Sequence, residues 1–474
     1  MKQLRVFLTC LGRNSIYFPG TTPPLGILYL AAYLRKCFDV EIRLLDQRAE
    51  NCSLQEVARR AIEFEADVVG IGTFTLYADT LPSLTTAIRQ GLPNSLIVLG
   101  GPHVSSFGAT ALENTAADAG VRGEGERPFE AIVSAWLAGS DFSHIPGLFW
   151  RDASGAIISN PGSMPVIEDL DSLPFPAYDL LDVSQYWRDF SFGNLPPHRY
   201  VSMFSSRGCP RLCTYCHSIF GKRFRAHSAE RIVEELKHYV RTYGITEVEF
   251  LDDTFNHDAK RAIQFADLMR KEGVKIKLGA PNGLQSHTLT EEVLDALVET
   301  GLHQASFALE SGSPRIQELI KKHLSIPKFI WCVEQAIKRR VLANGNTIMG
   351  FPTETEEDLK ATVDVVCQSK LHTVSFFTVV PYPNTELYEQ LKELQPEKLA
   401  KVRYWEKDFS VQPVNFSAVP DSVLFAIQRK AWRRFYLNPL RLARIARDYP
   451  DPWFLARLLP MFMRRVVKGI GVEE

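Results

Sequence analysis

The sequence lacks a long hydrophobic run, an excess of charge of either sign and a high cysteine content. No uninterrupted apolar stretch reaches the roughly 18 residues that a membrane-spanning helix needs, and residues 1–10 are typical of a strand, not of a signal sequence. Lysine and arginine number 54 against 55 acidic residues, so no bulk attraction to nucleic acid is expected. Eight cysteines in 474 residues are too few for a disulfide scaffold. These absences predict a cytoplasmic protein that binds no nucleic acid.

The remaining composition is typical of a folded globular chain. Hydrophobic residues make up 45% of the sequence and charged residues 23%, which are close to the averages for soluble proteins. At roughly 150 residues per domain, the length predicts about three modules instead of one compact core.

The first 140 residues alternate β-like runs with segments whose apolar residues recur at helical spacing. This alternation predicts a doubly wound, Rossmann-like α/β domain, which binds ligands beyond the carboxyl ends of its parallel strands. The expected strands are Arg5–Thr9, Val40–Asp46, Asp67–Thr73, Ser95–Leu99 and Ala119–Arg122.

Residues 141–199 predict a linker that contains a hairpin. Two short β-like runs, at 148–151 and 156–159, flank a turn-rich segment, and prolines recur through residues 161–197. A domain boundary is therefore expected in this region.

Residues 200–384 form a second series of βα units, which predicts a partial (β/α)6 barrel of the TIM type with its chemistry at the carboxyl ends of the strands. The expected strands are Val201–Ser205, Glu247–Leu251, Val274–Ala280, Gln304–Leu309, Ala343–Met349 and Val374–Val379.

Residues 385–474 predict a mainly helical region with a basic, aromatic tail. Between Gln428 and Val472 there are eleven lysine or arginine residues against two acids. Such a tail indicates either a peripheral contact with an anionic membrane, and with it a hydrophobic substrate, or a solvated face packed on the barrel.

Three cysteines, Cys209, Cys213 and Cys216, form a CxxxCxxC pattern in the loop after the first expected barrel strand. Three thiolates at this spacing can hold an iron–sulfur cube and leave its fourth iron open to an exchangeable ligand. The alternative is a closed zinc site with His217 as the fourth ligand, but adjacent residues rarely both reach one metal. The position at the end of a barrel strand favours the cluster.

With this motif, the sequence resembles the cobalamin-binding branch of the radical S-adenosylmethionine (SAM) superfamily. The resemblance covers nearly the whole chain and extends to the segments Leu99–His103, Gly123–Glu126, Leu251–Phe255 and Glu310–Gly312. It implies three cofactors, namely a 4Fe–4S cluster, SAM on the open iron, and cobalamin, together with a one-electron donor such as flavodoxin or ferredoxin. Reductive cleavage of SAM would yield a 5′-deoxyadenosyl radical that removes hydrogen from a small-molecule substrate.

The resemblance also implies roles for individual residues. Cys209, Cys213 and Cys216 would ligate the cluster. Around SAM, it places Tyr215 by the adenine, Glu310 and Ser311 at the ribose or methionine end, and Ile348 and Gly350 against the adenine. In the amino-terminal domain, the cobalamin loops contain Thr73, Phe74, Gly100, Gly101, His103, Gly123 and Glu124. The domain contains no Asp-x-His-x-x-Gly motif, so a histidine ligand to cobalt is not expected.

The leading hypothesis is a cobalamin-dependent radical SAM enzyme that methylates an unactivated carbon. Three alternatives stay open at this point. One is a radical oxidative cyclase or rearrangement enzyme similar to the anaerobic porphyrin cyclases. The second resembles the RNA methylthiotransferases, which carry a second cluster. The third is a non-catalytic cobalamin or iron–sulfur sensor.

Overall fold

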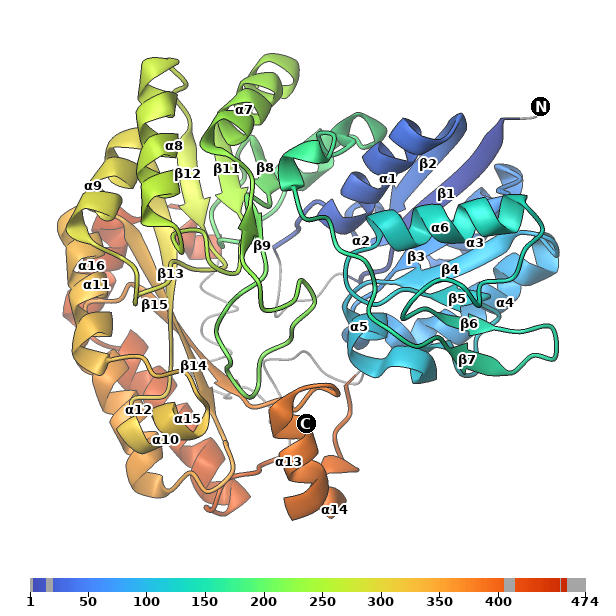
Figure 1. The fold of residues 1–474 in the computed structure, drawn as a ribbon. Helices are drawn as coiled ribbons and strands as arrows, with labels where there is room; N and C mark the ends of the chain where they lie inside the picture. The colour runs from blue at the N-terminus through green and yellow to red at the C-terminus, as the bar shows by residue number, and fades with distance from the viewer. Residues whose placement is uncertain (1–2, 14–19, 405–413, 452, 458–474) are drawn as a thin grey trace. The chain divides into compact units, whose positions relative to one another are not determined.

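The structure is a computed structural model that describes residues 3–13, 20–404, 414–451 and 453–457. The chain divides into two compact units, which are described separately (Figure 1). Unit 1 comprises residues 1–186 together with 217–226, and unit 2 comprises residues 187–216 together with 227–474.

Unit 1 is built on a seven-stranded sheet in the order β2-β1-β3-β4-β5-β6-β7. The first five strands of this order run parallel, whereas β6 pairs antiparallel with both β5 and β7. The strands are β1 (Leu4–Cys10), β2 (Val40–Asp46), β3 (Val68–Gly72), β4 (Leu96–Gly100), β5 (Ala119–Gly120), β6 (Phe149–Arg151) and β7 (Ile157–Ser159). The predicted doubly wound domain is confirmed, with a strand in each of the five expected places.

Helices cover both faces of this sheet. Val6 and Leu8 pack in a core with α1 and α6, whereas Phe7 packs on the opposite face with α3 and α4, because neighbouring strand residues point to opposite faces. The helices are α1 (Leu25–Cys37), α2 (Gln47–Glu50), α3 (Leu54–Glu63), α4 (Leu81–Gly91), α5 (Pro102–Phe107) and α6 (Glu126–Leu137).

The predicted hairpin exists as β6 and β7, but its assignment to a linker is corrected. Ala119 of β5 pairs with Trp150 of β6, so the hairpin extends the sheet of unit 1 as its antiparallel edge. Unit 1 accordingly runs on to Tyr186, well beyond residue 140.

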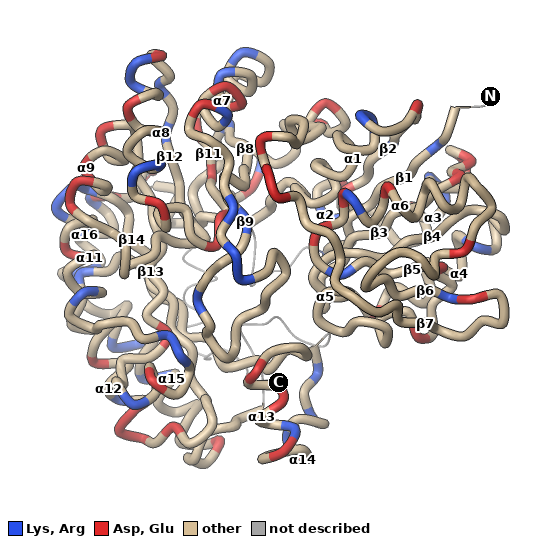
Figure 2. Tube along the Cα trace, viewed as in Figure 1, with Lys and Arg blue, Asp and Glu red and all other residues tan. Residues whose placement is uncertain are grey.

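Unit 2 contains the predicted series of six parallel strands, in the order β15-β14-β13-β12-β11-β8. The strands are β8 (Tyr200–Met203), β11 (Glu247–Phe250), β12 (Lys277–Ala280), β13 (Leu302–Glu310), β14 (Leu342–Met349) and β15 (Thr373–Thr378). The helices are α7 (Ala229–Tyr243), α8 (Ala259–Lys271), α9 (Glu291–Thr300), α10 (Pro314–Leu319), α11 (Ile326–Lys338), α12 (Glu356–Gln368), α13 (Glu386–Leu394), α14 (Pro396–Leu399), α15 (Asp421–Tyr436) and α16 (Pro439–Asp448). Many of the charged residues lie on these helices, whereas β14 carries none (Figure 2).

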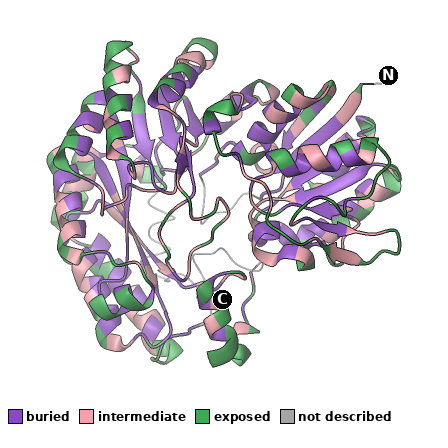
Figure 3. Ribbon diagram, in the orientation of Figure 1, coloured by how far each residue is buried: buried purple, intermediate pink, exposed green. Residues whose placement is uncertain are grey.

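One face of the unit 2 sheet is apolar and lies under helices. The ring of Phe376 in β15 packs edge-on against Trp432 and Phe435 of α15. Buried and half-buried residues alternate along β14 and β15, so their two faces differ in accessibility (Figure 3).

The described part of the basic tail packs on this outer face. Trp432, Phe435 and Tyr436 are buried, and the guanidinium of Arg441 lies 3.5 Å from the ring centre of Phe435. Arg441 is itself 2% exposed and donates to backbone carbonyls, including that of Cys367. Within the described residues, no helix combines the length and hydropathy that crossing a membrane requires.

Candidate functional site

The three cysteines of the CxxxCxxC motif lie on the loop that follows β8 and the short strand β9 (Ser206–Arg207). None of the three described cysteines forms a disulfide, and all three are half-buried. Gly208, just before Cys209, adopts a φ of +86°, which a side chain would disfavour. The loop therefore places all three cysteines beyond the carboxyl end of the first barrel strand, where the sequence predicted them.

Backbone hydrogen bonds fix the second half of this loop. The N–H of Cys216 donates to the carbonyl of Cys213 at 3.2 Å, which folds the two cysteines into one turn. The buried Thr214 between them donates its N–H to the carbonyl of Ile320 and accepts from the N–H of Leu387. Because the chain of Thr214 is held on both sides, the thiols of Cys213 and Cys216 project from an anchored turn.

The donor set of the loop fits an iron–sulfur cluster with three protein ligands. Among the residues that the structure describes, no three His, Cys, Asp or Glu side chains converge at metal-binding distance. Binding of the cluster would therefore have to bring the three sulfur atoms together. Three thiols at this spacing fit an open-site cluster better than a closed zinc tetrahedron, because the tetrahedron needs four donors.

Asp252 braces the first half of the cysteine loop from beneath. This carboxylate is 1% exposed, and it accepts the N–H of Ser205 at 2.7 Å and the hydroxyls of Ser205 and Ser206 at 2.5 Å each. Arg261 adds a hydrogen bond of 3.1 Å to the carbonyl of Ser205. Burial raises the pKa of Asp252, and the nearby Arg261 and the serine donors oppose that rise. The following helix, α8, is capped by Asp258 instead, whose side chain accepts the N–H of Arg261.

Glu310 ends β13 with a φ of +65°, a left-handed conformation that is uncommon for glutamate. Its carboxylate lies 3.3 Å from the Nζ of Lys322. An acid and an amine side by side can receive an amino acid group, which carries both complementary charges. Strained residues of this kind cluster at ligand sites.

Ser311 turns away from that position. It is fully buried, and its hydroxyl lies 3.2 Å from the hydroxyl of Thr362 on α12. Gln317 donates to the backbone carbonyls of Leu309 and Ser311, so the carboxyl end of β13 is tied down on both sides of Glu310. Ser311 is therefore placed to support Glu310 rather than to face a ligand.

Tyr215, Ile348 and Gly350 lie together in unit 2. Tyr215 and Ile348 pack against one apolar cluster, and the ring centre of Tyr215 is 5.6 Å from that of Phe351. Gly350 adopts a φ of +94°, and its N–H donates to Glu354 at 2.6 Å. Burial raises the pKa of Glu354 to about 8. Tyr215 and Ile348 thus provide an apolar surface for a flat ring, and Gly350 has no side chain that would keep the ring away from the backbone.

In unit 1, Thr73, Phe74, Gly100 and Gly101 follow the carboxyl ends of β3 and β4. A side chain on Gly101 would place its Cβ 2.9 Å from the carbonyl oxygen of Thr73, and the φ of Gly101 is +90°. A Cβ on Gly100 would meet nothing within 4 Å, and Phe74 is 53% exposed. An exposed ring beside open glycine backbone fits a large planar ligand.

His103 lies on α5 just beyond these glycines, but it is only 8% exposed. Its ring packs against Phe107 with a centre-to-centre distance of 4.7 Å. Burial lowers the pKa of His103 to about 4. His103 therefore lies as a neutral ring in the core of unit 1.

Gly123 and Glu124 follow β5. Gly123 has a φ of +75° and donates its N–H to the hydroxyl of Ser105 at 3.0 Å. The carboxylate of Glu124 is 4% exposed and forms an ion pair with Arg225. Glu124 therefore holds this loop in place and is not presented at the surface.

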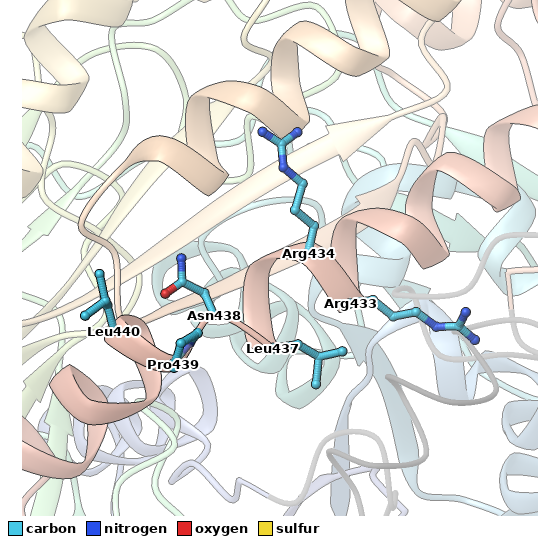
Figure 4. Close-up of a pocket in the computed structure, with 6 residues that line it drawn as sticks. All are labelled: Arg433, Arg434, Leu437, Asn438, Pro439 and Leu440. Atoms are coloured by element: carbon cyan, nitrogen blue, oxygen red, sulfur yellow. The ribbon is translucent and has the colours of Figure 1, made fainter.

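A surface depression of unit 2 lies at the end of α15. It is lined by Arg433, Arg434, Leu437, Asn438, Pro439 and Leu440. The two arginine side chains point away from each other (Figure 4). Arg434 is committed to an ion pair with Asp364. The depression contains no nucleophile or acid–base pair and belongs to no catalytic arrangement.

Sequence reasoning missed Asp252, Lys322, Glu354 and Arg225. For Asp252, the signal was its position directly after a buried strand, where a barrel places its chemistry. Lys322 and Arg225 carry no local signal, because their partners lie elsewhere in the chain.

Comparisons with known proteins identify two domain families in this chain. A family model described as the radical SAM superfamily matches residues 203–366, and one described as the B12 binding domain matches residues 15–133. The chain is 37% identical to an uncharacterized methyltransferase of Pyrococcus horikoshii, with 89% of each chain covered. It is 27% identical to the cytidylyl-2-hydroxyethylphosphonate methyltransferase of Streptomyces wedmorensis, with 78% of each covered.

A solved structure shares the fold. The cobalamin-dependent S-adenosylmethionine radical enzyme OxsB with aqua-cobalamin bound matches with a TM-score of 0.76 at 15% sequence identity. The match covers 97% of this chain and 71% of that chain.

Proposed function

This chain belongs to the radical SAM superfamily, among the members with a B12 binding domain, and we propose that it methylates an unactivated carbon of a small molecule. When bound, a 4Fe–4S cluster supplies the electron that cleaves SAM, and cobalamin carries the methyl group. The observation that carries the proposal is the CxxxCxxC loop at the carboxyl end of β8, in a chain that also contains a B12 binding domain.

The cysteine loop serves as the cluster site in this proposal. Cys209, Cys213 and Cys216 supply the three thiolates. Thr214 and Asp252 hold the two halves of the loop in place, and the cluster would bring the three thiolates together. A loop whose backbone is fixed in this way lowers the cost of assembling a metal site.

The end of β13 and the loop after β14 bind SAM in this proposal. Lys322 pairs with the carboxylate of SAM, and Glu310 accepts hydrogen bonds from its amino group or ribose hydroxyls. Tyr215, Ile348 and the backbone of Gly350 form the walls around the adenine. The apolar packing of these walls excludes water from the reacting atoms.

The carboxyl ends of β3, β4 and β5 bind cobalamin in this proposal. Phe74 and the open backbone of Gly100 contact the ring, and Gly101 and Gly123 let the chain turn close to it. His103 stays in the core and gives no ligand to cobalt.

A one-electron donor such as flavodoxin or ferredoxin completes the cycle, because reductive cleavage of SAM consumes one electron per event. The proposal includes no membrane contact of the tail, because Trp432 and Phe435 are buried in the core of unit 2. Residues 458–474 of the tail lie outside the described residues.

The proposal is tested on anaerobically reconstituted protein. We expect about four irons and one cobalt per chain, and formation of 5′-deoxyadenosine from SAM with a strong reductant. Cys209→Ala, Cys213→Ala and Cys216→Ala should each lose both iron and SAM cleavage, whereas the control Cys367→Ala, on α12, should keep both. Zinc in place of iron, or no 5′-deoxyadenosine under any condition, would overturn the proposal. Once a substrate is found, a product heavier by one methylene distinguishes methylation from cyclisation.

A further inference from the structure

The strands β13, β14 and β15 turn a polar, accessible face away from the helices. The helix-covered positions of β14 and β15, which include Gly345, Val374 and Phe376, are buried. The alternate positions are half-buried in both strands. We call these alternate positions the inner face.

The strand register defines the composition of the inner face. Ser306 pairs with Asn344, which pairs with Thr373, and Ala308 pairs with Asn346, which pairs with Ser375. Paired residues point to the same side of a sheet. Two rows of mainly amide and hydroxyl side chains therefore cross the three strands.

These rows lie directly below the residues that we assign to SAM. Asn346 precedes Ile348 by two residues and Asn344 precedes it by four. At about 3.3 Å per residue, they lie roughly 7 Å and 13 Å from Ile348, toward the amino end of β14. The upper row is thus within reach of a small molecule whose reacting carbon meets SAM.

The polar character continues deeper into the barrel. Glu249 pairs in register with Gly279, which pairs with Gln304, and both Glu249 and Gln304 are fully buried. The carboxylate of Glu249 accepts the N–H of Gly193 at 2.9 Å, whereas both amide atoms of Gln304 have no hydrogen-bond partner. Unpaired buried polar atoms are costly, so this interior is built for polar occupants and not for an apolar one.

From these rows we infer that the substrate of the proposed methyl transfer is a small, hydroxyl-rich, uncharged molecule held by Asn346, Ser375 and Asn344. Carboxamides and hydroxyls both donate and accept hydrogen bonds, as the hydroxyls of such a molecule do. The inner positions of β13, β14 and β15 from Gln304 to Phe377 include no lysine or arginine, so a phosphate would go unpaired there. An alkyl chain would leave the Asn346 amide without water or a partner. The inference rests on the proposed function and replaces the hydrophobic substrate suggested by the tail sequence.

The test measures binding of three ring compounds of similar size to the cofactor-loaded enzyme by saturation-transfer NMR. The probes are methyl glucoside, glucose 6-phosphate and cyclohexanol. We expect methyl glucoside to bind best. Asn346→Leu should weaken its binding about tenfold, and the milder Ser375→Ala should weaken it several-fold. The control Gln368→Leu, a similar replacement on the exposed surface of α12, should leave binding unchanged.

Tighter binding of cyclohexanol or glucose 6-phosphate, binding of none of the probes, or unchanged binding of methyl glucoside in both variants would overturn the inference. SAM cleavage without substrate is measured on the same samples. If 5′-deoxyadenosine forms while the probes contradict the inference, the proposed function stands and only the substrate class fails. If no SAM is cleaved, the proposed function itself fails.

Discussion

The guanidinium of Arg225 and the carboxylate of Glu124 form an ion pair that is almost completely buried within unit 1. Arg225 also donates to the carbonyl of Phe220 at 3.0 Å, and the N–H of Ile167 donates to the second oxygen of Glu124 at 3.1 Å. Arg225 follows Cys216 by only nine residues. The chain that leaves the last cysteine is therefore anchored to the loop after β5.

Arg225→Ala should strongly destabilise unit 1, because it leaves the buried carboxylate of Glu124 without its partner. Removing one member of such a pair costs about 3 to 5 kcal/mol. The control is Arg223→Ala, since Arg223 is 75% exposed and pairs at the surface with Glu168. A surface pair contributes about 1 kcal/mol or less. Urea unfolding measures both, and equal losses for the two variants would contradict the structural role of Arg225.

Asp252→Ala should lower the iron content of the reconstituted protein. The change removes three hydrogen bonds that hold Ser205 and Ser206 at the start of the cysteine loop. A misplaced Cys209 should then reduce cluster retention several-fold. Iron per chain and the electron paramagnetic resonance of the reduced cluster measure this effect. Asp267→Ala, on the exposed side of α8, should keep full iron content, and equal iron in both variants would exclude a brace at Asp252.

Local sequence signals predicted the elements of both sheets. Alternating and continuous apolar runs identified five strands of unit 1 and six of unit 2. A strand that is buried on one or both faces has apolar residues at regular positions, and this pattern is visible in the sequence. The start of α12 shows another signal within one segment, a complete capping box of Thr355 and Asp358.

Contacts between distant residues left no such signal. Ser205 and Asp252 are 47 residues apart, and Glu124 and Arg225 are 101 apart, so neither pair forms a pattern within one segment. The hairpin of β6 and β7 shows the same limit, because turn chemistry identifies a hairpin but not the sheet that it joins. The polarity of the inner face depends on the register of three strands, which only the fold supplies.

Lys322→Met should weaken SAM binding about tenfold or more, because it removes the cation beside Glu310. The neighbouring Lys321 provides the control. Lys321 lies at the surface and pairs with Glu386, so Lys321→Met should bind SAM like the parent protein. Equilibrium dialysis with SAM on the reconstituted enzyme measures both. Unchanged affinity in Lys322→Met would remove this residue from the proposed SAM site.

Glu354→Gln should flatten the pH dependence of stability between about pH 5 and 8. Burial raises the pKa of Glu354 to about 8 from an ordinary value of 4.5, although the N–H groups of Gly350 and Phe351 favour the charged form. Between these values the folded chain keeps a proton that the unfolded chain releases, so stability falls as the pH rises. The slope of this contribution is at most about 1.4 kcal/mol per pH unit. Glutamine cannot ionise and removes it.

The measurement compares urea unfolding of Glu354→Gln and the parent protein at several pH values. The difference between the two free energies of unfolding should change steadily from pH 5 to 8, in favour of the variant. Glu357→Gln is the matched control, because Glu357 is exposed on α12 and its pKa is lowered, so its difference curve should be flat above pH 5. A flat curve for Glu354→Gln would mean that Glu354 is charged in the folded protein. The N–H of Gly350 would then donate to an ionised carboxylate throughout this pH range. In that case the titration of Glu354 should add no pH dependence to SAM binding.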